Sequence, residues 1–355
     1  MKKFAVLKHF SISFSPTPKP FLALCPPLAL TFLLVLLPTN TSAAEPGESS
    51  IPLLLDPPVD AVPPSQRPPV TRLPPAVTRQ RRVRISPVAT DPGHLAPGTR
   101  LSLTLFPDLT ITATTTKIST DINGVRSIHA AIPGKPLAAV KLSVDGHRLL
   151  GSIDLPLENR HYRIRQAATG PDHRVEDLDL SRQPIPPGAD PLIPPGGSPL
   201  PLPLDLDPAT AEQPATIDIM VVYTPAASAW AAANANGIDS AINQIMMDAQ
   251  ATVDNNDLDI DFRLVHSAQV DYLETSPATD VARLRDRTDG FLDEIHDWRD
   301  THGADLVSML TEISDFAGIG YLGSTEPRPE GAAFTVVGVQ YRDAYTFIHE
   351  IGHNL

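Results

Sequence analysis

Cysteine is almost absent from this 355-residue chain: the only one, Cys25, lies in an apolar segment near the N-terminus. If that segment is removed, no cysteine remains, so disulfides cannot stabilise the folded protein. The fold must then rely on its hydrophobic core, with or without a bound metal. Hydrophobic residues make up 42% of the chain, which is enough for a sizeable core, and the length allows two domains.

Lysine is missing from the last two fifths of the chain, and proline is rare there. Residues 216–355 hold 23 acidic residues, seven arginines and no lysine, a net charge of −16, whereas residues 1–215 carry +3. Only four of the 39 prolines lie beyond position 215. A proline-rich, slightly basic first part and an acidic second part predict two units with different functions. The acidic balance argues against nucleic-acid binding, because phosphates require Lys and Arg for neutralisation.

No apolar run is long enough for a membrane span, which takes about 20 residues. The run "LALTFLLVLL" (Leu28 to Leu37) follows a lysine-rich start and precedes the small residues of "TSAA". This order is typical of a secretion signal, so we expect residues 1–44 to be a signal peptide cleaved after Ala44. We expect a secreted protein, extracellular or periplasmic, of bacterial origin, with no membrane span once the signal is removed.

The first part divides into three segments. Residues 45–98 are proline-rich with a basic run, "RQRRVR", and we expect them to be mostly irregular. Residues 99–182 alternate in polarity, and "VKLSVDGHRLLGSIDL" places Asp-Gly between two such runs, which favours a hairpin. We therefore predict a β-rich domain over residues 99–182. Residues 183–215 are rich in Pro and Gly and predict an extended, protease-accessible linker.

From residue 216 onward, strand-like and helix-like segments alternate. "TIDIMVVYT" and "DLVSMLT" are near-continuous apolar runs, as in strands that are buried on both faces. Apolar residues recur at helical spacing over residues 238–256 and 280–303. Two short extended segments, "GIGYLGS" and "AFTVVGVQ", precede a helix that begins near Tyr345. This order predicts an α/β fold with a mixed, mostly parallel sheet covered by helices and right-handed crossovers.

The last helix carries "HEIGH", two histidines four residues apart. Residues i and i+4 lie one turn apart on the same helix face, so His349 and His353 can bind one metal ion. Catalytic zinc takes three protein ligands and leaves one position for water, and Glu350 can reach that water as a general base. The pattern is short, and a charged helix without metal is the alternative. Its place directly after the last strand of an α/β sheet favours Zn²⁺.

The segment "HEIGHNL" resembles the opening of the metzincin zinc signature, H-E-x-x-H-x-x-G-x-x-H. "DLVSMLT", "GIGYLGS", "FTVVGVQ" and "YTFIHEIGHNL" follow in an order that resembles the reprolysin-type (adamalysin-like) metallopeptidases over residues 216–355. The resemblance implies a zincin-like catalytic domain with the active-site helix at the C-terminus of the chain, preceded by a β-rich propeptide. It implies a secreted zinc endopeptidase made as a zymogen, whose partners are its own propeptide and a protein or peptide substrate.

The resemblance also implies residue roles. His349 and His353 would be zinc ligands, and Glu350 would be the general base for hydrolysis by a zinc-bound water. The edge strand would receive extended substrate through main-chain hydrogen bonds. Its residues are Gly318, Ile319, Gly320, Tyr321, Leu322 and Gly323.

Two features depart from the family pattern. The glycine and third histidine of the signature would fall at positions 356 and 359, beyond Leu355, so we expect a C-terminally truncated, incomplete catalytic domain. With two ligands, we expect weak zinc binding and no activity. The mature chain also has no propeptide cysteine to occupy the zinc; a carboxylate near the linker, Asp205 or Asp207, is the candidate substitute.

Two other interpretations remain open: a zincin with a different third ligand from a later helix, and an inactive secreted binding module on the same scaffold. The residues that follow Leu355 distinguish them. The charge difference suggests a further hypothesis, in which the basic first part docks on the acidic second part as an inhibitor or folding aid. Such long-range attraction should weaken as salt is added.

Overall fold

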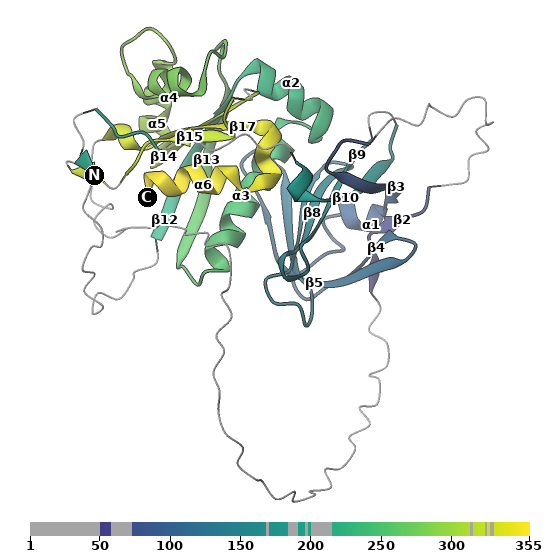
Figure 1. Ribbon diagram of the computed structural model, residues 1–355. Helices are drawn as coiled ribbons and strands as arrows, with labels where there is room; N and C mark the ends of the chain where they lie inside the picture. The colour runs from purple at the N-terminus through teal and green to yellow at the C-terminus, as the bar shows by residue number, and fades with distance from the viewer. Residues whose placement is uncertain are drawn as a thin grey trace, which may run out of the picture.

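The structure is a computed structural model that describes residues 50–57, 73–167, 170–183, 191–195, 198–199, 215–312, 315–323, 325–326 and 330–355. The predicted signal peptide, most of the predicted linker, and Asp205 and Asp207 lie outside the described residues. The described residues form two units that lie side by side in Figure 1: an N-terminal sheet unit (residues 50–183) and a C-terminal α/β unit (residues 215–355).

The N-terminal sheet unit contains a ten-stranded sheet in the order β1-β4-β5-β6-β7-β8-β9-β10-β3-β2. β1 pairs with β4 and β2 with β3, so the short segment of residues 51–55 contacts strands near both ends of the sheet. A cluster of buried apolar side chains fills this unit. The strands are β1 (Ile51–Pro52), β2 (Leu54–Leu55), β3 (Val77–Ile85), β4 (Arg100–Phe106), β5 (Leu109–Thr120), β6 (Arg126–Ala131), β7 (Ala139–Asp145), β8 (Arg148–Leu155), β9 (Arg160–Gln166) and β10 (His173–Leu178), with helix α1 (Pro87–Thr90) after β3.

The predicted hairpin is confirmed. β7 and β8 are antiparallel, and Asp145 pairs with Arg148 across a two-residue loop. The loop begins at Gly146, whose φ is 59°, a conformation that glycine adopts without the steric penalty of a Cβ atom.

The expectation that residues 45–98 are mostly irregular is wrong for Val77–Ile85, which forms strand β3. β3 pairs with β10 along its length, and the basic run lies within it. Val77 and Val83 are buried, and the arginines between them have acidic partners. Arg79 pairs with Asp177 of β10 at 3.1 Å, whereas Arg82 pairs with Asp172, just before β10, and Arg81 with Asp56. The charges therefore belong to a strand with matched neighbours, and the β-rich unit begins well before residue 99.

The C-terminal α/β unit has a five-stranded sheet in the order β13-β12-β14-β17-β15. The first four strands are parallel and β15 is antiparallel at the edge, which confirms the predicted mixed, mostly parallel sheet. The strands are β12 (Ala215–Tyr223), β13 (Ile260–Gln269), β14 (Leu306–Thr311), β15 (Gly318–Gly320) and β17 (Phe334–Gly338). A separate pair joins β11 (Ser198–Pro199) to β16 (Thr325–Glu326).

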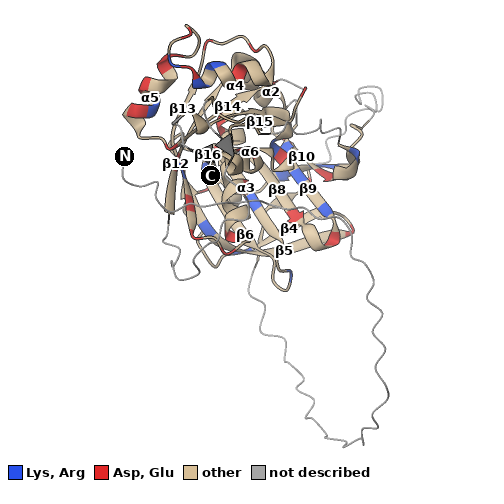
Figure 2. Ribbon diagram, turned by 60° about the vertical axis from the view of Figure 1, so that its left-hand side comes forward, with Lys and Arg blue, Asp and Glu red and all other residues tan. Residues whose placement is uncertain are grey.

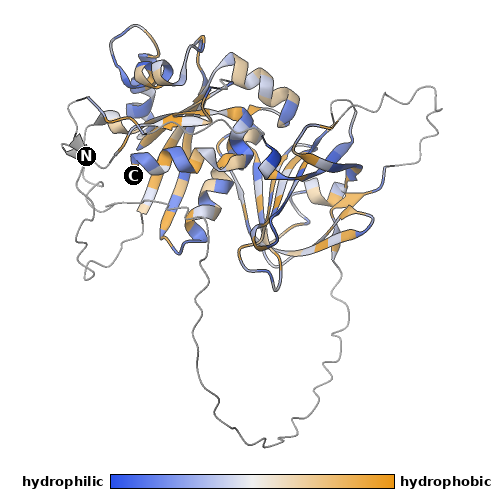
Figure 3. Cartoon of the chain, viewed as in Figure 1, coloured by the Kyte–Doolittle hydropathy of each residue, from blue (hydrophilic) through white to orange (hydrophobic). Residues whose placement is uncertain are grey.

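Helices cover both faces of this sheet. Alternate residues of β12 enter two different cores: Ile219 and Val221 pack with α2, α3 and α6, whereas Met220 and Val222 pack with α4 and α5. Figure 3 shows apolar residues concentrated on these central strands. The helices are α2 (Pro225–Asn234), α3 (Ile238–Asp254), α4 (Pro277–Arg285), α5 (Glu294–His302) and α6 (Thr346–Asn354). No helix among the described residues is long and apolar enough to cross a membrane.

The predicted helix over residues 280–303 is divided into α4 and α5. Between them, the carboxylates of Asp286 and Asp289 each accept a hydrogen bond from a backbone N–H two residues on, which competes with the helical pattern. The break leaves Phe291 at the surface, where it is 42% exposed, while Leu292 is buried. Figure 2 shows the acidic residues that follow along α5.

Candidate active site

Helix α6 presents the two predicted metal ligands on one side. A short 3-10 helix, η5 (Val339–Ala344), follows β17, and Tyr345, with a φ of 58°, turns the chain into α6. Phe347, Ile348 and Ile351 pack into the core on one side of the helix. Because an α-helix has 3.6 residues per turn, His349 and His353 lie together on another side.

The ring nitrogens of the two histidines converge. The Nε2 atoms of His349 and His353 are 3.2 Å apart. Two nitrogens bound to one tetrahedral zinc at about 2.05 Å each would lie about 3.3 Å apart, so the pair fits zinc. Burial, and then His349, lower the pKa of His353, which favours the neutral imidazole that binds metals. Within the described residues, no third His, Cys, Asp or Glu completes a group of three.

Glu350, between the two histidines, is buried against the edge strand. Its side chain is 1% exposed, and its Oε2 has no hydrogen-bond partner among the described residues. Burial raises the pKa of Glu350 to about 8. A carboxyl group whose pKa lies near neutral pH is suited to accepting and returning a proton.

The strand β15 lies at the edge of the sheet, where the sequence placed it. One side of β15 pairs with β17. On the other side, Leu192 forms a parallel bridge with Tyr321: the Leu192 N–H donates to the Gly320 oxygen at 2.9 Å, and the Leu322 N–H donates to the Leu192 oxygen at 2.8 Å. A piece of the predicted linker therefore lies along the edge that was expected to receive substrate.

The edge strand and α6 are joined at their ends. The Gly323 N–H donates to the His353 oxygen at 2.7 Å, and the Asn354 side-chain amide donates to the Tyr321 oxygen at 2.7 Å. The side chains of Ile319 and Tyr321 are buried in the core on the far face of the sheet. The edge strand can therefore offer a ligand its main chain at these positions, but not these side chains.

Three charged residues that the sequence analysis did not single out lie buried where the two units meet: Lys141, Asp248 and Asp343. A signal for Lys141 exists in the strand pattern. Lys141 and Ser143 alternate with Val140, Leu142 and Val144, and all five are buried, so both faces of β7 are covered. Because Lys141 and Ser143 share one covered face of β7, that face is expected to contact another polar surface.

Comparison with known proteins finds a family model that matches the C-terminal unit. Residues 213–355 match the model of metallo-peptidase family M12. The matched residues contain α6, the histidine pair and the edge strand. Residues 213–355 are therefore similar to metallo-peptidase family M12, and the predicted resemblance to a reprolysin-type metallopeptidase is confirmed.

Bacterial relatives named peptidyl-Asp metalloendopeptidase are similar over a longer stretch. The protein from Stenotrophomonas maltophilia (strain R551-3) is 29% identical over 227 residues, which cover 62% of this chain and 51% of the relative. The protein from Xanthomonas campestris is 28% identical over 282 residues, covering 75% of this chain and 65% of the relative. The chain thus spans about half the length of the first of these relatives (51%).

Among solved structures, metalloproteinase-II from Bacteroides fragilis aligns with 72% of this chain and 80% of its own, with a TM-score of 0.44 and 11% identity.

Proposed function

We propose that this protein is a secreted zinc-dependent endopeptidase that is made as a zymogen. The observation that carries the proposal is the 3.2 Å approach of the His349 and His353 Nε2 atoms, with Glu350 in the same turn, inside a segment similar to metallo-peptidase family M12. The order of residues 1–44, a basic start followed by an apolar run and small residues, supports secretion.

His349 and His353 would hold the metal, and we propose that a third ligand completes the site. When bound, zinc supplies a Lewis acid for the scissile carbonyl and lowers the pKa of water. Glu350 takes the proton of the attacking water and returns it to the leaving amine. The main chain of β15 aligns the peptide by adding it to the sheet as a further strand.

The position of Leu192 supports latency. Its two main-chain hydrogen bonds to Gly320 and Leu322 use the edge groups that an extended substrate would need. Because the linker joins the two units, the N-terminal sheet unit is the proposed propeptide and its linker covers the edge strand until it is displaced.

The relatives' name supports peptides containing aspartate as the first substrates to test. The full-length product of the gene should hydrolyse them and casein, and a zinc chelator should abolish this activity. Glu350→Gln should lower kcat/KM about 100-fold or more, because general-base catalysis contributes about 10²- to 10⁴-fold. Glu294→Gln, the same change at an exposed site on α5, is the control. Wild-type activity in Glu350→Gln would show that the base is assigned wrongly.

A further inference from the structure

The N-terminal sheet unit contacts the C-terminal unit through a polar surface on helix α3. The Asn243 side-chain oxygen accepts hydrogen bonds from the Ser127 and Ser143 hydroxyls, at 3.1 Å and 2.6 Å. Further hydrogen bonds between the units join Gln244 to Ser152 and the Asn236 oxygen to Arg148. Within the described chain, Leu150 is the one residue of the N-terminal sheet unit among the buried members of the core around α3.

A first buried ion pair crosses this surface. Lys141 of β7 is 2% exposed, and its Nζ pairs with Asp248 of α3 and, at 2.8 Å, with Asp154 of its own unit. Burial alone lowers the pKa of Lys141, but Asp248 and Asp154 outweigh it and raise the pKa well above its ordinary value. The lysine is therefore charged, and it neutralises a carboxylate on each side of the contact.

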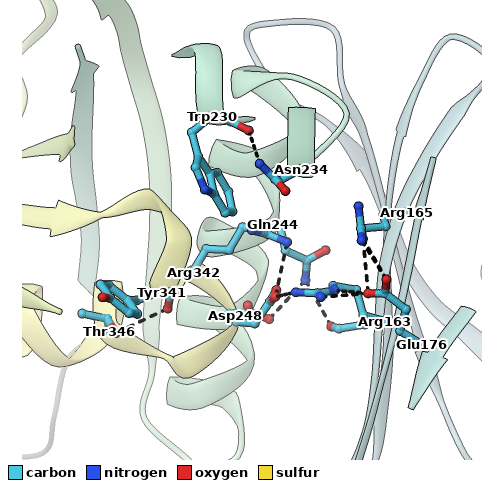
Figure 4. Close-up of polar contacts among 12 residues, drawn as sticks. Arg163, Arg165, Glu176, Trp230, Asn234, Gln244, Asp248, Tyr341, Arg342 and Thr346 are labelled. Carbon is cyan, nitrogen blue, oxygen red and sulfur yellow. Dashed lines mark hydrogen bonds and ion pairs between the residues drawn. The ribbon is translucent and has the colours of Figure 1, made fainter. Parts of the chain in front are cut away.

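A second ion pair reaches the turn before the active-site helix. Arg163 of β9 donates to Asp343 in η5 at 2.6 Å while its other nitrogens bind Glu176 of β10. Burial alone would raise the pKa of Asp343, but Arg342 and Arg163 hold it at about 2. Figure 4 shows Arg163 and Arg165 beside Glu176. Two residues after Asp343, Tyr345 starts α6, and its hydroxyl is 3.4 Å from Lys141 Nζ.

Separating the units would leave Asp248 without its lysine and Asp343 without Arg163. Separation would return these charges to water, so the pairs favour the bound state only through their mutual attraction, and close charge pairs across a protein interface can be clearly net favourable. Arg342 Nη2 also lies 3.2 Å from Asp343 Oδ2. The Arg342 side chain is itself buried, and its Cζ atom lies 5.1 Å from the centroid of the Trp230 ring. Paired charges therefore add to the hydrogen bonds that join the two units.

We propose that cleavage of the linker does not release the N-terminal sheet unit, which stays bound to α3 and η5 through Lys141–Asp248 and Arg163–Asp343. The cut N-terminal fragment is thus a partner of the C-terminal unit. Its sheet unit binds beside the start of α6, and Leu192 of its linker binds the edge strand. This inference rests on the proposed function only for the consequence that the bound unit keeps the enzyme latent. Because salt screens buried pairs weakly, the association resists salt, unlike a long-range attraction between a basic and an acidic half.

The test uses the chain with residues 205–211 replaced by the recognition sequence of a specific protease. After cleavage, the two fragments should elute together from a sizing column at about 0.1 M and about 1 M salt. Lys141→Met should weaken their association at least about 100-fold. The matched control is Lys135→Met in the same unit, because Lys135 is 43% exposed and pairs with Glu158 at the surface.

Two further variants separate a lost ion pair from a folding defect. Asp248→Asn changes the other unit and should also weaken the association. Lys141→Met combined with Asp248→Leu removes both charges and should restore most of the binding, since apolar replacement of a buried pair is often tolerated. Fragments that separate without any substitution, or a Lys141→Met variant that binds as tightly as the Lys135→Met control, would overturn the proposal. The readout needs no zinc and no activity, so it stands apart from the test of the proposed function.

Discussion

Gly318 lies directly against Glu350: an ideal Cβ atom on the glycine would come within 2.6 Å of the Glu350 Cγ and 2.8 Å of its Oε1. β15 can approach α6 this closely only because Gly318 carries a hydrogen atom where other residues carry a side chain. The glycine of "GIGYLGS" thus positions the glutamate in addition to belonging to the edge strand.

Gly318→Ala should therefore move the Glu350 carboxylate or push β15 away from α6. A displacement of about 1 Å in an active site can lower the rate about 100-fold, so we expect kcat of the full-length enzyme to fall by that order with a smaller change in KM. The control is Gly352→Ala on α6, where a Cβ atom would have no neighbour within 4 Å. Equal kcat values in the two variants would contradict the positioning role.

Leu192→Pro should expose the edge strand in the uncut chain, because proline cannot donate the hydrogen bond that the Leu192 N–H gives to Gly320. We expect the Leu322 amide, which donates to the Leu192 oxygen, to exchange with deuterium faster, as measured by NMR or mass spectrometry. Ile193→Pro is the control, because the Ile193 side chain is 49% exposed and lies one position along. If the Leu322 amide is equally protected in both variants, Leu192 does not hold the edge.

The buried pair of His161 and Asp154 should make the folded protein less stable as the pH rises. Burial lowers its pKa, but the neighbouring Asp154 outweighs burial and raises it, and Asp343 and Lys141 also face the ring. A group whose folded pKa is raised stabilises fully below its unfolded pKa of about 6.5, and this contribution disappears as pH rises through the folded value. The melting temperature should therefore fall as the pH rises above about 6.5 and through the raised folded pKa, and His161→Gln should flatten that decline. The control is His94→Gln, the same change at an exposed histidine. If the melting temperature declines with pH equally steeply in both variants, His161 is not the group responsible.

Zinc should stabilise the chain through the histidine pair. Binding to the folded state raises the melting temperature by mass action, and the shift should saturate as zinc is added. His353→Gln should abolish the shift because a single imidazole remains, whereas His302→Gln, a change at an exposed histidine on α5, should leave it. A shift of the same size in His353→Gln would place the zinc elsewhere.

Much of the C-terminal unit could be predicted because its signals are local and strong. "TIDIMVVYT" and "DLVSMLT" are apolar runs that became central strands, and the period around Ile242 and Ile245 became α3. The histidine pair could be predicted because i and i+4 spacing fixes geometry within one helix. The hairpin at Gly146 was found from its turn residues.

Other features depend on partners far away in the sequence. The arginines of β3 resemble a solvated charge run until Asp172 and Asp177, 88 to 98 positions later, lie beside three of them. Lys141 is buried because Asp248, on another unit, faces it. The glycine at 318 shows its role only when α6 packs against it. Such long-range pairings are not encoded in local periodicity, so the sequence alone did not reveal them.

The central claim is that His349 and His353 hold one zinc ion, and anomalous X-ray scattering at the zinc absorption edge tests it most directly. Crystals of the full-length protein grown with zinc should show a peak about 2.1 Å from the Nε2 atoms of both histidines. A peak at any other place, or none at this pair with zinc in excess, would contradict the account.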